Sequence, residues 1–321
     1  MRFVSIPNNG SSWRDRLLYS FVTESEEPQD VEVEIVNTIT GGVMGSMRLY
    51  GVTSGVVDIA PYIRPYVSMS IVETTQYASL AVSPSAIGVK VCIDEVESES
   101  RVFFRSQFDY ESATILSTMS EPLEVFEGDA IRLTLFAKTR IDVQITFIGL
   151  KTNTAKCEGL TYGMPMELVI QTKDIEQLAK VVVNLRYDGR NMKICNYIAK
   201  PRYGTSQRLV WYNTNGGVDG YVFDHAIRKE YSVDRAKGCL CGEGAVSVDG
   251  RVKYRLCSGY EQQEVMERVA QLMLSPVVYR EVDGICRVVD VESSDIAFDD
   301  KGLLHTMSLN ISEKWEGDRL W

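Results

Sequence analysis

Two histidines, His225 and His305, are the side chains of this sequence best suited to act as a general base near neutral pH. A serine or cysteine hydrolase would need one of them beside an activated nucleophile, so its activity would depend on His225 or His305. No G-x-S-x-G motif or related nucleophile signature is present. His305 alternates with Leu303, Met307 and Leu309, a pattern typical of a packed strand face. The sequence therefore predicts no catalytic residue and a protein that is not an enzyme.

Seven cysteines are scattered along the chain, at positions 92, 157, 195, 239, 241, 257 and 286. Cys239 and Cys241, followed by Cys257, resemble part of a metal site, but their spacing is C-x-C and no histidine follows at ligand spacing. A strand that places Cys239 and Cys241 on one face is the simpler interpretation. We expect buried thiols in a reducing compartment, no bound metal and no cofactor.

Carboxylates could also do chemistry, either as a glycosidase pair or as calcium ligands. Glu95, Glu97, Asp109 and Glu111 lie in polar segments, which indicates a solvated surface. The run Asp299-Asp300-Lys301-Gly302 resembles part of a calcium loop but lacks the spacing of an EF-hand. We interpret this run as a turn between strands.

Residues 209–223 form the most distinctive stretch of the sequence. Its glycines could cradle a phosphate, but that use requires a helix directly after them. An aromatic strand follows instead, so the stretch is predicted to be a β-hairpin with a tight reversal. The residues with candidate roles in this turn or in an interaction are Trp211, Tyr212, Asn213, Gly216, Gly217 and Asp219.

The aromatic residues of this hairpin suggest a second class of function, because aromatic rings stack on sugars. Strand alternation puts Trp211 and Tyr212 on opposite faces, so at most one of them could join a given platform. We expect core packing for one ring and an interface for the other. The alternative function is a carbohydrate-binding β-sandwich module or adhesin whose glycan affinity depends on Trp211.

Strand patterns position these residues throughout the chain, and they predict a mainly β fold. Residues 31–36 alternate between apolar and acidic side chains, and residues 131–136 and 141–148 are similarly strand-like. We predict a β-sandwich domain over residues 1–152, interrupted at Pro61 and Pro65 by a crossover or a short helical turn. The polar run near residue 152 is interpreted as a domain boundary.

The rest of the chain is predicted to form two further units, a β region over residues 153–223 and an α+β C-terminal domain over 224–321. In the latter, the spacing of Ser258 and Glu261 matches a capping box. An apolar stripe over residues 265–273 then predicts one amphipathic helix lying on a sheet. Asp283-Gly284 predicts a hairpin turn.

The composition is ordinary for a folded chain of 321 residues, with 34 basic against 44 acidic side chains and a net charge of −10. This acidity, without a basic cluster, argues against direct nucleic-acid binding. No signal peptide and no stretch of about 18 apolar residues is present, so we expect no membrane insertion and synthesis in a cytoplasm.

The hairpin pattern W-x-N-x-x-G-G-x-D-x-(aromatic)-x-F, from Trp211 to Phe223, resembles tail- and baseplate-type structural proteins of phages and prophages of gut Bacteroidetes. The later run is similar to the same proteins: a helix ending in Leu274-Ser-Pro, a hairpin through Asp283-Gly284, and a closing strand. The resemblance is best over residues 201–321. The segment from Cys239 to Cys257 and the tail from Trp315 to Trp321 depart from the pattern.

This resemblance implies a non-enzymatic structural component of a phage or prophage tail that assembles into a ring, hub or baseplate. It implies a homo-oligomer that contacts other virion or tail proteins, is made in the host cytoplasm and is assembled into the virion. Rigid sheets with edges that pair or pack against neighbours suit such a role.

Overall fold

A computed structural model describes residues 1–106, 114–119, 123–138, 140–159, 163–173, 177–187, 189–202, 206–237, 245–293, 298–301 and 304–314. Side chains are described within these ranges except at 157–159, 225–227, 236–237, 245–248 and 298–301. The chain is mainly β, as the sequence predicts, and the described strands form five sheets with two short α-helices.

The N-terminal part is a β-sandwich. One sheet contains β1 (Arg2–Ser5), β2 (Leu18–Val22) and β5 (Ser54–Asp58). The other contains β3 (Gln29–Asn37), β4 (Val43–Val52), β7 (Ile87–Ile93), β8 (Val96–Glu97) and β9 (Arg101–Phe103). The alternation predicted in β3 is confirmed, because Val31, Val33 and Ile35 are fully buried in the core between the sheets. Pro61 and Pro65 lie in α1 (Ala60–Ile63) and η1 (Arg64–Tyr66), which confirms the helical turn.

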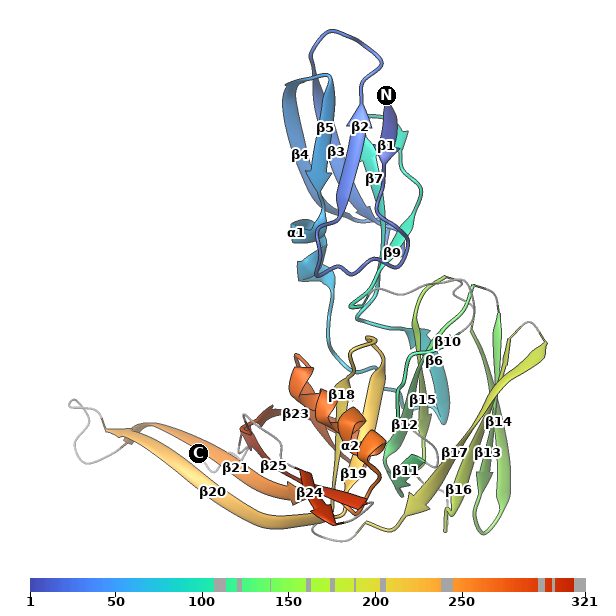
Figure 1. Ribbon diagram of the computed structural model, residues 1–321, viewed down its shortest axis with the longest axis vertical. Coiled ribbons are helices and arrows are strands. Elements are labelled where there is room, and N and C mark those ends of the chain that lie inside the picture. The colour runs from blue at the N-terminus through green and yellow to red at the C-terminus, as the bar shows by residue number, and fades with distance from the viewer. Residues whose placement is uncertain are drawn as a thin grey trace.

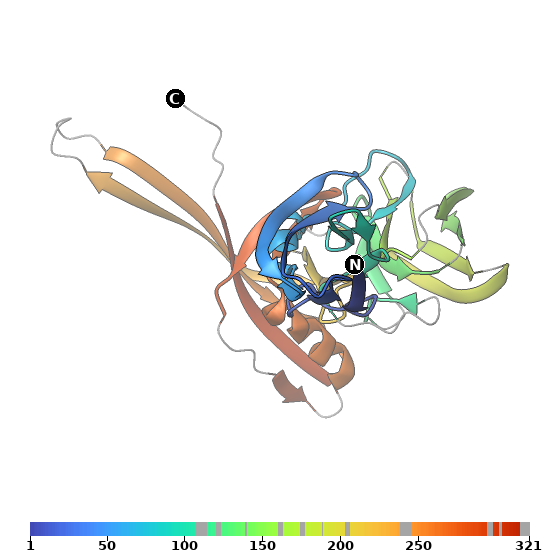
Figure 2. The same ribbon diagram turned by 90° about the horizontal axis from the view of Figure 1, so that it is seen from above.

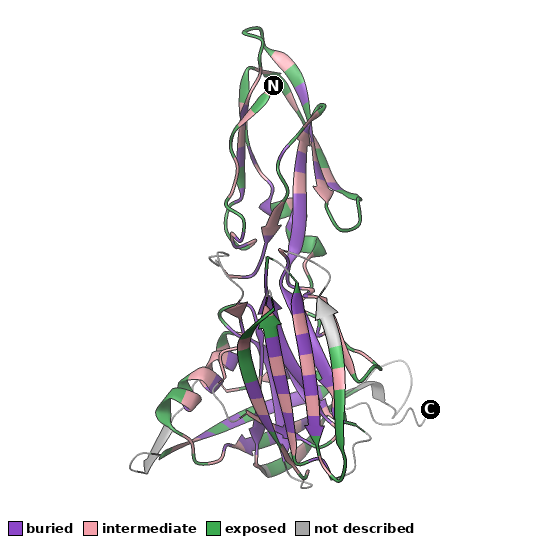
Figure 3. Cartoon of the chain, turned by 90° about the vertical axis from the view of Figure 1, so that its right-hand side faces the viewer, coloured by how far each residue is buried: buried purple, intermediate pink, exposed green. Residues whose placement is uncertain are grey.

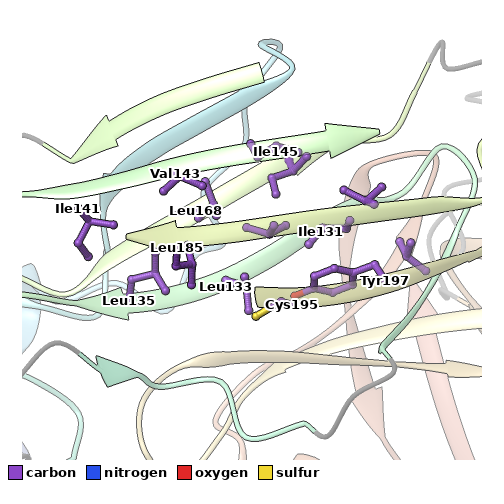
Figure 4. Close-up of a cluster of buried hydrophobic side chains, with 14 of the residues drawn as sticks. Ile131, Leu133, Leu135, Ile141, Val143, Ile145, Leu168, Leu185, Cys195 and Tyr197 are labelled. Carbon is purple, nitrogen blue, oxygen red and sulfur yellow. The ribbon is translucent and has the colours of Figure 1, made fainter. Parts of the chain in front are cut away.

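A second sandwich occupies the middle of the chain. Its four-stranded sheet contains β6 (Ala78–Val82), β10 (Thr114–Ile115), β12 (Ala130–Phe136) and β15 (Met166–Gln171). The five-stranded sheet contains β11 (Leu123–Phe126), β13 (Ile141–Ile148), β14 (Thr152–Gly159), β16 (Lys180–Tyr187) and β17 (Arg190–Lys200). Figure 4 shows apolar side chains of the two sheets, among them Leu133, Val143 and Leu185, meeting in the core between them.

The C-terminal part is one large sheet with a helix on one face, as predicted. The sheet contains β18 (Gln207–Tyr212), β19 (Val218–Phe223), β20 (His225–Lys237), β21 (Ala245–Cys257), β22 (Val278–Val282), β23 (Ile285–Val291), β24 (Phe298–Lys301) and β25 (Leu304–Lys314). The helix α2 (Gln263–Ala270) continues as η2 (Gln271–Leu274). Met266, Val269 and Leu272 form the predicted stripe and are buried against the sheet.

The predicted capping box at Ser258 and Glu261 is wrong. The helix begins at Gln263, and Gln262 precedes it without a side-chain cap. Ser258 and Glu261 lie instead on an extended segment beside β25. Ser258 Oγ accepts a hydrogen bond from Met307 N at 2.8 Å, and the Glu261 backbone bridges His305. Ser258 therefore stabilises the contact with β25 and does not cap the helix.

The middle sandwich and the C-terminal sheet pack face to face, so β12 is buried on both sides. Ile131 and Leu133 point into the sandwich core. Arg132 points the other way and reaches Glu281 of β22, with its Nη2 3.6 Å from the carboxylate Oε1. By contrast, buried and less buried residues alternate along the strands of the outer five-stranded sheet, which faces the viewer in Figure 3.

The predicted domain boundaries do not coincide with the sheets. The boundary at 152/153 cuts a hairpin, because β13 and β14 pair from Ile141↔Gly159 to Ile148↔Thr152. The polar run over residues 151–156 lies mostly in β14, paired with β13, and is not a linker. The boundary at 223/224 divides the C-terminal sheet, since β18 pairs with β22. The range 1–152 also contains strands of both sandwiches, because the chain passes from β5 to β6, returns to β7, and leaves again after β9.

The molecule is elongated (Figure 1). The N-terminal sandwich stands away from the other two units, which lie side by side (Figure 1). The strands β20 and β21 run out from the body as a two-stranded arm, and the view from above confirms this projection (Figure 2). No helix in the described part of the chain is long and apolar enough to span a membrane.

Candidate interaction surfaces

The glycine-rich turn joins β18 and β19, as the sequence predicts, with Trp211 opposite Asp219. Gly216 has a φ of +80°, which glycine adopts without strain. A Cβ at Gly216 would lie 2.5 Å from the Phe104 ring, and one at Gly217 would lie 2.7 Å from the Leu116 backbone. Both glycines are therefore required because neighbouring segments approach closely.

Asn213 and Asp219 hold this turn against the middle sandwich. Asn213 Nδ2 donates to Leu116 O and to Asp219 Oδ2, both at 2.9 Å. Thr118 donates to Asp219 through its backbone N at 2.9 Å and through Oγ1 at 2.6 Å. Burial raises the pKa of Asp219. The polar residues of the motif thus bind this chain's own segment 116–119.

Trp211 and Tyr212 lie on opposite faces of β18, as predicted, and both are fully buried. Trp211 packs in the core under α2. The Tyr212 hydroxyl lies 2.8 Å from Ser70 O and 3.1 Å from Glu167 Oε1, and its single hydrogen donates to one of these acceptors at a time in the interface with the middle sandwich. Neither ring is exposed, so neither offers a stacking surface to a sugar.

Arg105 connects the N-terminal sandwich to the same turn. Its Nη1 donates to Tyr212 O at 2.8 Å and to Asn213 O at 3.0 Å. Its Nη2 donates to Leu274 O at 3.0 Å, at the end of η2. This buried guanidinium donates to three backbone carbonyl groups at the junction of the units. The turn is therefore the point where all three units meet.

Buried charges lock the middle sandwich to the C-terminal sheet. Glu281 is fully buried, and its Oε2 lies 3.0 Å from Arg208 Nη1. Its Oε1 accepts from Ala130 N at 3.1 Å, and Arg132 also faces it. Asp129 is paired with Arg202 nearby. Burial, followed by the charge of Glu281, raises the pKa of Asp129 to about 7.

Glu167 is a further buried carboxylate in this interface. Ser83 Oγ donates to its Oε1 at 2.8 Å, and Val72 N donates to its Oε2 at 3.4 Å. Burial raises the pKa of Glu167. Glu167, like Glu281, is fully buried, and its carboxylate accepts hydrogen bonds from donors of the same chain. The arrangement suits a structural lock, because a substrate would have no access to these oxygens.

The other predicted chemical groups do not form a site within the described residues. His225 lies on β20 and His305 on β25, with β21 between them, and the His225 side chain is not among those described. Glu95 is exposed, and Glu97 is an exposed partner of Lys90 at 2.7 Å. Asp109 and Glu111 lie outside the described residues.

The structure describes the side chains of four of the cysteines and the backbone of most of the acidic run at 299–302. Cys92, Cys195, Cys257 and Cys286 are free thiols, whereas Cys239 and Cys241 lie outside the described residues. No group of three or more potential ligands in the described part of the chain could hold a metal ion. The interpretation of the run 299–302 as a turn is wrong over residues 299–301, because they lie in β24, paired with β25, and Gly302 lies outside the described residues.

A groove of about 600 Å³ lies beside α2. Tyr260, Arg268, Glu124 and Glu261 are among the residues that line it. The Tyr221 hydroxyl donates to Glu261 Oε1 at 3.2 Å, and burial raises the pKa of Glu261. The groove is thus a partly acidic surface with one exposed aromatic ring, Tyr260.

The arm presents two different faces. The register Tyr231↔Val252 and Val233↔Gly250 puts Tyr231 and Val233 on the same face as the core residue Val252. Tyr231 is 57% exposed, whereas Val252 is buried. The opposite face carries charged side chains, among them Arg228 and Asp234. The apolar face of the C-terminal sheet therefore continues along the arm beyond the elements that cover it.

The arm also has a free edge. Among the described residues, β20 pairs with β21 and with no other strand, and it ends the strand order of its sheet. Within the described ranges, the pairing of β21 with β25 extends from Cys257↔Ser308 to Arg251↔Lys314. An edge strand exposes a row of unpaired backbone N–H and C=O groups. The arm thus combines an open edge with an exposed apolar face.

Comparisons with known proteins assign no family to this chain. No protein-family model matches it, and no curated protein matches it. Among solved structures, one match is a crystal structure described as DIP-gamma IG1+IG2, at 11% identity and a TM-score of 0.19. This match covers 63% of the present chain and 97% of the other. The similarity is too low to transfer any property to this chain.

Proposed function

We propose that this chain is a non-enzymatic structural component of a phage or prophage tail, in a ring, hub or baseplate. The observation that carries the proposal is the arm, which extends from the body with a free strand edge and an exposed apolar face (Figure 1). Exposed features of this kind mark protein–protein contacts. The partners are further copies of the chain and other tail proteins.

The interior of the molecule supports a building block that keeps its shape. Arg105 ties the N-terminal sandwich to the glycine-rich turn, and Glu281 joins the middle sandwich to the C-terminal sheet. Fixed relative positions of the units allow the arm and the body to present surfaces in a constant geometry. An assembly with closed symmetry requires such constancy.

The proposal is tested in tail particles. A strain that carries the gene is induced to produce particles, with an epitope tag on the chain, and the particles are separated by density centrifugation. We expect the tagged chain in the tail fraction, with antibody label at one place along the tail. Recovery of the folded chain from the soluble fraction alone, with intact tails lacking it, would overturn the proposal.

A further inference from the structure

The edge of β20 is complementary in charge to a second copy of itself. We propose that two copies of this chain pair their β20 strands antiparallel, around a two-fold axis at Tyr231, to form a continuous four-stranded sheet from the two arms. This inference deepens the proposed function, because it names the partner and the surface of one assembly contact.

The side chains of β20 determine the register. With the axis at Tyr231, Arg228 of each copy lies opposite Asp234 of the other, which gives two opposite-charge pairs. Glu230 of each copy then lies opposite Ser232 of the other. An axis at Ser232 would set Glu230 opposite Asp234, and one at Glu230 would set that carboxylate opposite itself. Like charges directly opposite each other destabilise a strand pair, whereas opposite charges stabilise it. The Tyr231 axis is therefore favoured over its neighbours.

The apolar face agrees with this axis. The Tyr231 side chains of the two copies would lie directly opposite each other, each beside its own buried Val252. Val233, 40% exposed, would lie opposite Lys229 of the second copy, whose alkyl stem can cover it. Pairing would thus cover apolar surface that is exposed in the single chain and would fill the free edge.

The strand is regular where the pairing requires it. The register of β20 with β21 shifts between Ala226 and Arg228 and again between Ala236 and Lys237, and is uninterrupted from Arg228 to Ala236. All residues of the proposed pairing lie in this regular stretch. No proline blocks the edge.

Charge reversal tests the register in the full chain. By sedimentation equilibrium, we expect Arg228→Asp and Asp234→Arg each to weaken self-association by about tenfold or more, since each creates two like-charge pairs. An equimolar mixture of the two variants restores both opposite-charge pairs, so it should self-associate as the wild type does. Arg287→Asp, on the exposed surface of β23, is the matched control and should leave self-association unchanged.

Cysteine cross-linking tests the axis independently of charge. Tyr231→Cys should form a covalent dimer under mild oxidation, whereas Val233→Cys should yield no more dimer than the wild type, because it faces Lys229. Failure of the mixed variants to associate, or absence of the Tyr231→Cys cross-link in a wild-type-like oligomer, would overturn the arm pairing. Those outcomes leave the proposed function intact, since it fails on a separate result, absence of the chain from tail particles.

Discussion

At the scale of single residues, a few buried charged groups hold the units of this chain together. Glu281, Arg208 and Arg132 come from three strands, and together they form a buried charge cluster between the middle sandwich and the C-terminal sheet. Isolated charges are costly to bury, and each becomes tolerable through its partners. The removal of one partner should therefore lower the stability of the whole interface.

We predict that Glu281→Gln lowers the free energy of unfolding by about 3–5 kcal/mol, because two buried guanidinium groups lose their counter-charge. The measurement is urea denaturation followed by circular dichroism. Glu97→Gln is the matched control, since Glu97 pairs with Lys90 on the exposed surface. Equal stability of the two variants would show that the cluster does not fasten the units.

The sequence identifies the motif residues but not their partners. The alternation of Trp211 and Tyr212 and the glycines of the turn follow from local patterns, and the structure confirms both. The groups that bind the turn are about 100 positions away: Arg105 donates to Asn213 O, and Thr118 donates to Asp219. Such long-range contacts leave no local signal in one sequence, so Arg105 was not predicted.

At the scale of elements, the sequence predicts the strands that bury one face in a core, but it does not predict the exposed strands. In β13 buried residues alternate with less buried ones, and its pattern is clear in the sequence. The edge strand β14 is polar and exposed over residues 152–154, so it resembles a linker. In β20 the consecutive charged residues Arg228, Lys229 and Glu230 interrupt the alternation of apolar and polar side chains. The sequence pattern therefore does not predict the arm.

The role of Ser258 gives a prediction at this scale. Ser258→Ala should lower the free energy of unfolding by about 1–3 kcal/mol, because the buried Met307 N–H loses its acceptor. Hydrogen exchange measures where the loss falls. We expect faster exchange at Met307 with little change over residues 263–270. Faster exchange confined to the helix would support a capping role and contradict the strand contact.

At the scale of the whole molecule, three β units are fixed around one turn, and an arm extends from the last of them (Figure 2). The net charge of −10 would repel unguided association between copies at low ionic strength. Any self-association must then come from a specific, complementary surface. The free edge of β20, with charges of both signs and an apolar face, is such a surface.

The mass of the full chain in solution tests this account most directly. Sedimentation equilibrium of the purified protein over a wide concentration range should give a species of twice 36.1 kDa or a higher even multiple. Circular dichroism confirms that the sample is folded. A folded protein that stays at 36.1 kDa at every concentration would contradict the account.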